Sequence, residues 1–214
     1  MEYVQNYNFS NENSLQIISN YLKSKEGFIL DNFPFIGDFG TSIRDDQVTS
    51  RSGGYNVFHM QDECPELQNL LNFISESYFH YIDNILPNKT FDNKDINPAI
   101  NCWLNILHTS ENIDMHKHSD VYGDLWSFVS GTFVLSAKNT STFYKSNNNI
   151  EIFENTNVDG QLTIFPPYYY HWTSIHTDEE PRLTLGFDIF FQKDHAKSNI
   201  NFYNILVDLN NSEG

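Results

Sequence analysis

Histidine and acidic residues gather in one short stretch, DMHKHSD at residues 114–120. Side chains two positions apart on an extended strand face the same side, so His116 and His118 would present their imidazoles together. A third imidazole, His171, comes much later in the chain, in YYYHWTSI. Neutral imidazole is a common metal ligand. Three ligands on adjacent corners of one ion leave open positions for a substrate and a small molecule, as in non-haem iron(II) sites.

The second chemical signal is a cation that opens the last clear strand, residues 182–191. Arg182 is followed on its own face by Thr184 and Gly186, and the alternate positions are all apolar: Leu183, Leu185, Phe187, Ile189 and Phe191. A guanidinium on the inner face of a sheet is costly unless a carboxylate meets it, from the protein or from a bound anion. The strand therefore predicts a sheet that holds an acid.

The other histidines have blander interpretations. His80 falls inside a helical pattern and is expected to be structural. His108 is expected in the core or in a pocket wall, and His176 on the surface or at the rim of the site.

Two helices should precede the strands. The apolar face within residues 11–25 predicts a helix that Asn13 or Ser14 caps and Gly27 ends. Pro65 should open a second helix that ends before Pro87, and its wide apolar stripe should cover a sheet. Residues 28–60, rich in turn signals, are expected to form short strands and loops.

From residue 101 the apolar period changes to two, which predicts about eight strands, including the segment around His116 and ending with residues 182–191. Helices followed by many short strands favour a barrel or sandwich backed by helices. We expect one domain, in which residues 1–98 form a helical and mixed support, residues 99–192 the β core and residues 193–214 a C-terminal extension.

Composition excludes several classes of function. The 214 residues are 39% hydrophobic and 15% aromatic, as in a globular protein, with no apolar run of membrane-spanning length and no secretory signal. The formal net charge of −16 argues against binding to nucleic acid or to an anionic membrane. The two cysteines, Cys64 and Cys102, have no metal-ligand spacing, so we expect reduced thiols and a cytoplasmic protein.

Five motifs resemble the iron(II)- and 2-oxoglutarate-dependent oxygenases, whose core is a double-stranded β-helix. They are CWLN at 102–105, HKH at 116–118, SGTFVL at 130–135, LTIFPPYYYH at 162–171 and EPRLTLGFDI at 180–189. The chain looks most similar to a branch of such oxygenases found in phages and marine bacteria, for which the host cytoplasm would be the location. The resemblance covers residues 100–191.

The resemblance implies a role for each matching residue. His116 and His171 match the pair of iron ligands. Arg182 matches the residue that binds the distal carboxylate of 2-oxoglutarate, and Thr184 matches the hydroxyl beside it. Trp103 and Asn105 match a strand that lines the cosubstrate pocket.

The middle ligand has two possible registers. Most of the wider superfamily has a carboxylate there, in H-x-D, whereas the most similar branch has H-x-H. This sequence offers both, as His116-x-His118 and as His118-x-Asp120. We favour His118 as the middle ligand, and Asp120 stays open.

The activity that the resemblance implies uses Fe(II), 2-oxoglutarate and O2, and releases succinate and CO2 as a C–H bond is hydroxylated. The substrate would be a protein side chain, such as proline, or a small molecule. Two other interpretations remain: a cupin-like metal protein that uses no 2-oxoglutarate, and a non-catalytic phage accessory module. Substrate specificity is expected in the loops at 28–60 and 120–128, where Trp126 and Phe128 would form a lid.

Overall fold

The computed structural model describes residues 3–33, 49–51, 54–85, 98–118, 127–146, 150–191 and 203–204. Helices come first and most strands afterwards, as the sequence predicts. The elements in chain order are β1 Gln5–Asn8, α1 Glu12–Ser24, α2 Glu26–Asn32, the 3-10 helix η1 Val57–Met60, α3 Glu66–Asn84, β2 Pro98–Leu107, β3 Ser127–Ser136, β4 Ser141–Lys145, β5 Phe153–Thr156, β6 Gln161–Phe165, β7 Tyr170–Thr173, β8 Arg182–Phe191 and β9 Tyr203–Asn204.

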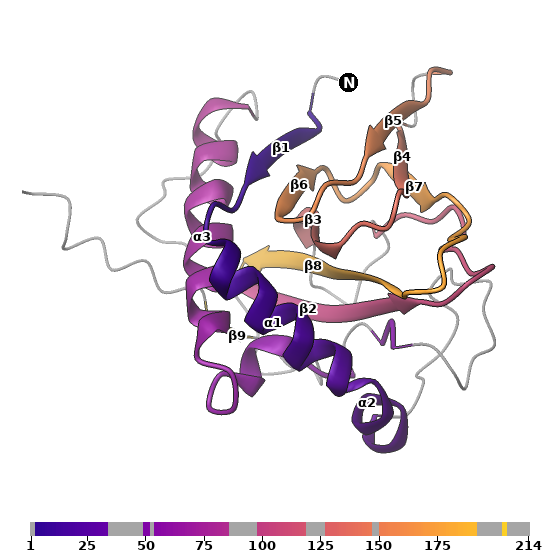
Figure 1. Cartoon of the computed structure of the whole chain (residues 1–214). Helices are drawn as coiled ribbons and strands as arrows, with labels where there is room; N and C mark the ends of the chain where they lie inside the picture. The colour runs from indigo at the N-terminus through magenta and orange to yellow at the C-terminus, as the bar shows by residue number, and fades with distance from the viewer. Residues whose placement is uncertain are drawn as a thin grey trace, which may run out of the picture.

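The strands form two antiparallel sheets. The larger has the order β1-β6-β3-β8-β2-β9 and the smaller the order β5-β4-β7. The long strands β2 and β8 pair along their whole length and run side by side through the molecule (Figure 1). Neighbours in each sheet are often distant in sequence, so closing these pairs brings the start and the end of the β region together.

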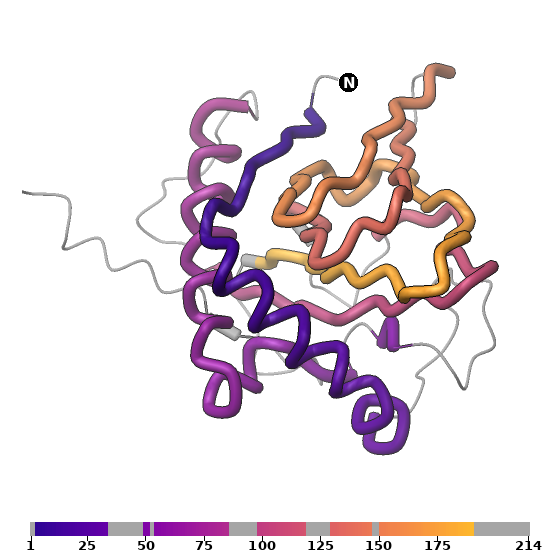
Figure 2. Tube along the Cα trace, viewed as in Figure 1, coloured from indigo at the N-terminus to yellow at the C-terminus, as the bar shows by residue number. Residues whose placement is uncertain are grey.

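Helices α1 and α3 lie to one side of the strands, as the tube trace also shows (Figure 2). Their apolar stripes enter the main core, where Ile18, Leu22, Leu70 and Ile74 meet the buried side chains of the larger sheet. Burial of such side chains contributes about 1.5–3 kcal/mol each. The helices therefore hold the larger sheet from behind and leave its other face for the smaller sheet.

Strand β8 confirms the alternation that the sequence predicts. Leu183, Leu185, Phe187 and Ile189 are all buried in the main core beneath the helices. Arg182 lies on the opposite face and is 1% exposed. Both faces of β8 are thus buried. One packs against apolar side chains, and the other faces the region between the two sheets.

The N-terminal region differs in detail from the sequence prediction. Asn11 caps α1 by accepting a hydrogen bond from the backbone N–H of Ser14, in place of the expected Asn13 or Ser14. Gly27 does not stop the helical region, because α2 begins at Glu26 after a turn at Lys25. The helix from Pro65 is found as α3. Within the described parts of residues 28–60 the regular elements are α2 and η1, not short strands.

The segment around His116 is not a regular strand. His116 makes one isolated antiparallel bridge to His171, with mutual backbone hydrogen bonds of 3.0 and 2.8 Å. The backbone N–H of His118 then donates to the carbonyl of Pro167. Two short pairings at the ends of the chain, β1 with β6 and β9 with β2, complete the larger sheet and were not predicted.

Candidate metal centre and carboxylate site

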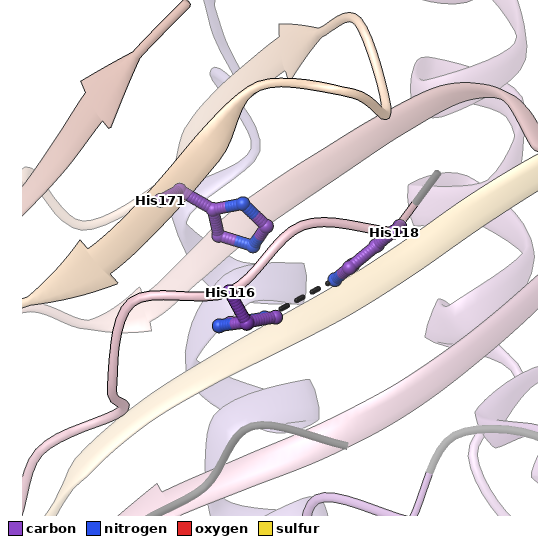
Figure 3. A group of neighbouring side chains, drawn as sticks. All are labelled: His116, His118 and His171. Carbon is purple, nitrogen blue, oxygen red and sulfur yellow. Dashed lines mark hydrogen bonds between the residues drawn. The ribbon is translucent and has the colours of Figure 1, made fainter. Parts of the chain in front are cut away.

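Three histidines converge between the two sheets. His171 lies on β7 of the smaller sheet and is buried, and His116 and His118 lie on the segment that the isolated bridge holds beside it. The three side chains point toward one another (Figure 3). Each offers one ligand nitrogen, and these nitrogens all lie within 4.8 Å of one another. The isolated bridge therefore brings the imidazoles together, which a regular strand was expected to do.

The hydrogen bonds of the three rings fix which nitrogen is free. The Nδ1 atoms of His116 and His171 contact the carbonyl oxygens of Asp114, at 2.7 Å, and of Tyr169, at 3.2 Å. The Nδ1 of His118 contacts a carboxylate oxygen of Asp188 at 2.8 Å. Carbonyl and carboxylate oxygens only accept, so all three Nδ1 atoms carry the proton. Every Nε2 lone pair is therefore left for another partner.

These free lone pairs face one another. The Nε2 atoms of His116 and His118 are 3.2 Å apart, the contact dashed in Figure 3. Two ligands on neighbouring corners of an octahedral ion, each about 2.1 Å from it, lie about 3 Å apart. Two acceptors at this distance repel unless a proton or a cation lies between them. The donor set fits a divalent transition metal.

Burial keeps two of the rings neutral, which is the state that binds metal. Burial, reinforced by the neighbouring His118, lowers the pKa of His116 to about 4. Burial also lowers the pKa of His171 well below its usual value, and His116 and His118 add to the effect. At neutral pH both rings therefore carry a lone pair at Nε2 and need not lose a proton to bind a metal.

Asp120, the alternative ligand, lies outside the described residues. A different acid reaches the site: Asp188, from β8, is 2% exposed and receives hydrogen bonds from His118 and from the hydroxyl of Ser130. Neither Asp188 nor Ser130 was predicted as a site residue. The signal was available, because Asp188 continues the face of β8 that begins with Arg182 and Thr184.

The guanidinium of Arg182 lies buried at the other end of this face. Its Nη2 donates a long hydrogen bond of 3.5 Å to Thr142 on β4, so it spans from one sheet to the other. Within the part of the chain that the structure describes, its Nε and Nη1 have no hydrogen-bond partner. Burial lowers the pKa of Arg182 to about 10, which leaves it charged at neutral pH. A buried cation with unsatisfied N–H groups fits an anionic ligand.

Three more buried polar atoms around Arg182 lack partners in the described structure: Thr184 Oγ1, Asn105 Oδ1 and the hydroxyl of Tyr144. Thr184 and Asn105 are directly paired across β8 and β2. Tyr144 is paired with His171 across β4 and β7, and their rings stack 6.3 Å apart. Burial raises the pKa of Tyr144, which keeps the phenol neutral and able to donate. Tyr144 thus links the arginine end of the space to the histidine end.

Trp103 forms a wall beside the histidines. Its ring centre is 5.6 Å from that of His118, and its indole covers Gly186 on β8. A Cβ atom at position 186 would lie 2.8 Å from the indole Cε2, so only glycine fits without displacing the ring. The two residues that were expected to line the pocket, Trp103 and Asn105, both lie on the inner face of β2.

The three other histidines that the sequence singled out, His80, His108 and His176, are not part of this cluster. His176 was expected on the surface or at the rim of the site, but it is fully buried. Its Nε2 donates to the carbonyl of Glu180, and its backbone bonds to Ser110 and Glu111. His176 therefore fastens two loops together. His80 contacts the hydroxyl of Tyr7. His108 was expected in the core or in a pocket wall, but it is exposed and contacts Glu26 at 2.6 Å.

Comparisons with known proteins identify the fold. The structure is similar to a prolyl-4-hydroxylase from Pseudomonas putida, with a TM-score of 0.58 and 12% identity over 91% of this chain and 95% of the other. A Trichoplax adhaerens prolyl hydroxylase in complex with a hypoxia inducible factor peptide gives 0.57 and 12% over 90% and 86%. The non-haem alpha-ketoglutarate-dependent carbocyclase SnoK, from nogalamycin biosynthesis, gives 0.58 and 8% over 88% and 79%.

No family model matches the sequence, and no curated protein does. At these identities the structural likeness establishes the fold, which is the predicted double-stranded β-helix backed by helices. The phage and marine bacterial branch stays a prediction. None of the helices within the described residues is long and apolar enough to cross a membrane.

Proposed function

We propose that this protein is a non-haem Fe(II)- and 2-oxoglutarate-dependent oxygenase that hydroxylates a C–H bond. The observation that carries the proposal is the buried, unsatisfied guanidinium of Arg182 in the same inter-sheet space as three convergent imidazoles. A metal site alone would suit a cupin-like protein that uses no cosubstrate. Such a protein has no need of a buried cation, which is stable only when an acid joins it.

Each residue of the site has a task in this proposal. His116, His118 and His171 would hold the metal through their Nε2 atoms. Arg182 would bind the distal carboxylate of 2-oxoglutarate by charge-assisted hydrogen bonds, with the hydroxyls of Thr184 and Tyr144 as further donors. Trp103 would exclude water from one side of the metal. The chemistry that Fe(II) supplies when bound is the use of O2 to oxidise 2-oxoglutarate to succinate and CO2 and to hydroxylate the substrate.

The substrate belongs to one of two classes, a protein side chain or a small molecule. Two of the structural neighbours are prolyl hydroxylases, so prolyl peptides are the first substrates to test. A low-molecular-weight C–H substrate is the second class, as the carbocyclase among the neighbours suggests.

The direct test is turnover of the cosubstrate. The purified protein, supplied with Fe(II), 2-oxoglutarate and O2, should release succinate even without its substrate, and the rate should rise when the substrate is found. His171→Ala should abolish the release, because it removes a ligand from the only histidine cluster that the described structure contains. Metal-bound protein that converts no 2-oxoglutarate, with any peptide or small molecule tried, would contradict the proposal.

Arg182→Met separates the cosubstrate from the metal. Loss of one partner of a buried charge pair costs about 2–5 kcal/mol, so the affinity for 2-oxoglutarate should fall by about 30-fold or more. The free energy of unfolding of the ligand-free protein should not fall, because methionine replaces a buried cation whose Nε and Nη1 groups are unsatisfied. Isothermal titration and urea unfolding measure the two effects. Unchanged affinity in Arg182→Met would rule out this residue as the carboxylate ligand.

A further inference from the structure

We propose that Asp188 completes the metal centre without being a ligand itself, as the hydrogen-bond partner of the ligand His118. Its carboxylate would hold His118 in the tautomer that binds metal and would bring to the site the negative charge that three neutral imidazoles lack. This inference rests on the proposed metal site but not on the identity of the cosubstrate.

The position of Asp188 is fixed by the larger sheet. Residue 188 pairs with Ser130 across β8 and β3, in the buried middle of the sheet. The Ser130 hydroxyl donates a short hydrogen bond to Oδ1 of Asp188 and lies 3.2 Å from Nδ1 of His118. The same Oδ1 accepts from His118 at 2.8 Å. The three groups form one compact network, with Asp188 on a rigid strand at its base.

His118 needs this support more than the other two ligands do. His116 and His171 are tied to each other by two backbone hydrogen bonds, and their Nδ1 atoms donate to carbonyls of their own segments. His118 lies beyond that bridge, outside any strand. Its ring is oriented by a side chain from β8, seventy positions away in sequence. Asp188 thus joins a loop ligand to the most rigid part of the fold.

The chemical nature of the partner matters as well as its position. A carboxylate behind a metal-bound imidazole fixes the ring and raises its basicity, and such partners affect metal affinity by about 10–100-fold. Non-haem iron(II) sites usually include one carboxylate among the ligands. Here the cluster is made of histidines alone, and the buried acid contacts one of them from behind. The negative charge of the carboxylate therefore lies one imidazole ring away from the metal, whereas in most such sites the carboxylate is itself a ligand.

Metal titration of Asp188→Asn tests the charge. Asparagine keeps the size of the side chain and an oxygen that can accept from His118, so packing is retained and the negative charge is lost. Co(II), followed by its visible absorption, should bind 10–100-fold more weakly to Asp188→Asn than to the wild type. Asp159→Asn is the matched control, because Asp159 accepts a hydrogen bond from the backbone of Ala137, outside the site, and should bind Co(II) as the wild type does. Affinity within twofold of the wild type in Asp188→Asn would overturn the proposal.

The tautomer of His118 gives a second readout, which a general loss of stability would not produce. Nitrogen NMR of the metal-free wild type should show the proton of His118 on Nδ1, whereas Asp188→Ala should shift it toward Nε2. An unchanged tautomer in a folded Asp188→Ala protein would also overturn the proposal. His118→Ala distinguishes the two levels: if this variant binds Co(II) as tightly as the wild type, His118 is no ligand and the proposed metal site itself is wrong.

Discussion

At the scale of single residues, the site is defined by polar atoms that the protein buries without satisfying. Nε and Nη1 of Arg182 and the hydroxyls of Thr184 and Tyr144 have no hydrogen-bond partner in the described structure, and His171, one of the three convergent imidazoles, stacks on Tyr144. Unsatisfied buried groups cost about 1–3 kcal/mol each, so a folded protein retains several in one place only where a ligand meets them. The ligand-free protein therefore has polar groups in place to bind a metal ion and an anion.

The lowered pKa of the histidines predicts how the stability of the metal-free protein depends on pH. The pKa of His116 is about 4 in the folded state, below the usual value of the unfolded chain, so between these values the unfolded state binds more protons. The free energy of unfolding should therefore fall as the pH falls from about 6.5 to about 4, by up to about 3 kcal/mol from His116 alone. The partly exposed ring makes this an upper limit, and His171 acts in the same direction.

Urea unfolding in the presence of a chelator, at several pH values, measures this slope. His116→Gln should flatten it, because glutamine does not titrate. A slope that is the same in wild type and variant would mean that the ring of His116 is not held neutral in the folded protein.

Much of the site was predictable at this scale, for a physical reason. Histidine and arginine are rare enough on inner faces that His116, His171 and Arg182 stood out by type and spacing. Asp188 and Tyr144 did not, because their importance comes from partners on other strands. Tyr144 becomes notable only when β4 pairs with β7 and brings it beside His171.

At the scale of the elements, β8 serves two layers at once. Leu183, Leu185, Phe187 and Ile189 pack in the helix-covered core, whereas Arg182, Thr184 and Asp188 lie on the opposite face with the candidate site. Two glycines show how tightly both layers are filled. A Cβ at Gly131 on β3 would overlap the ring of Phe187 in the helix-covered core, and a Cβ at Gly186 would press on Trp103 in the site.

The two glycine-to-alanine variants should therefore differ in what they damage. Gly131→Ala overpacks the core and should lower the free energy of unfolding by about 1–3 kcal/mol, with unchanged metal affinity in the folded protein. Gly186→Ala should displace Trp103 toward His118 and weaken metal binding. Chemical unfolding and Co(II) titration of both variants check this. Equal effects of the two substitutions on metal affinity would show that the two faces of the sheet are not independent.

Period-two patterns identified the strands of the β core, but the local structure differs from the sequence prediction in three places. The segment at His116 was expected to be a strand of the period-two region that begins at residue 101, yet it pairs through a single bridge. Gly27 was expected to end a helix, but it lies within α2, at a place where a Cβ atom would meet nothing within 4 Å outside the helix's own backbone. Strand β1 lacks a clear apolar alternation and forms because β6 offers it an edge.

At the scale of the whole molecule, the helices, the larger sheet and the smaller sheet form three successive layers. The apolar core lies between the first two and the polar site between the last two. Composition and element order predicted this arrangement, which the structural neighbours share at 12% identity or less. The single-domain boundaries, including the extension at 193–214, stay predictions. Asp120, Trp126 and most of that extension lie outside the described residues. So do residues 34–48 and 120–126, which belong to the loops at 28–60 and 120–128 that were expected to set specificity.

The layered arrangement has one consequence for the binding of metal and 2-oxoglutarate. If the imidazoles hold a metal and Arg182 holds the far end of 2-oxoglutarate in the same space, the two ligands must strengthen each other's binding. Coupling of this kind is reciprocal and typically amounts to about 5–150-fold. If metal and 2-oxoglutarate occupied separate places, neither would change the affinity of the protein for the other.

The most direct test is therefore the affinity of the metal-free and the Mn(II)-loaded protein for 2-oxoglutarate, measured by calorimetry. We expect at least tenfold tighter binding in the presence of Mn(II), within the range typical of such coupling. The gain should disappear in His171→Ala, which lacks a metal ligand, while binding should be weak with or without metal in Arg182→Met. Equal affinity with and without Mn(II) in the wild type would contradict the assignment of this space as a shared metal and 2-oxoglutarate site.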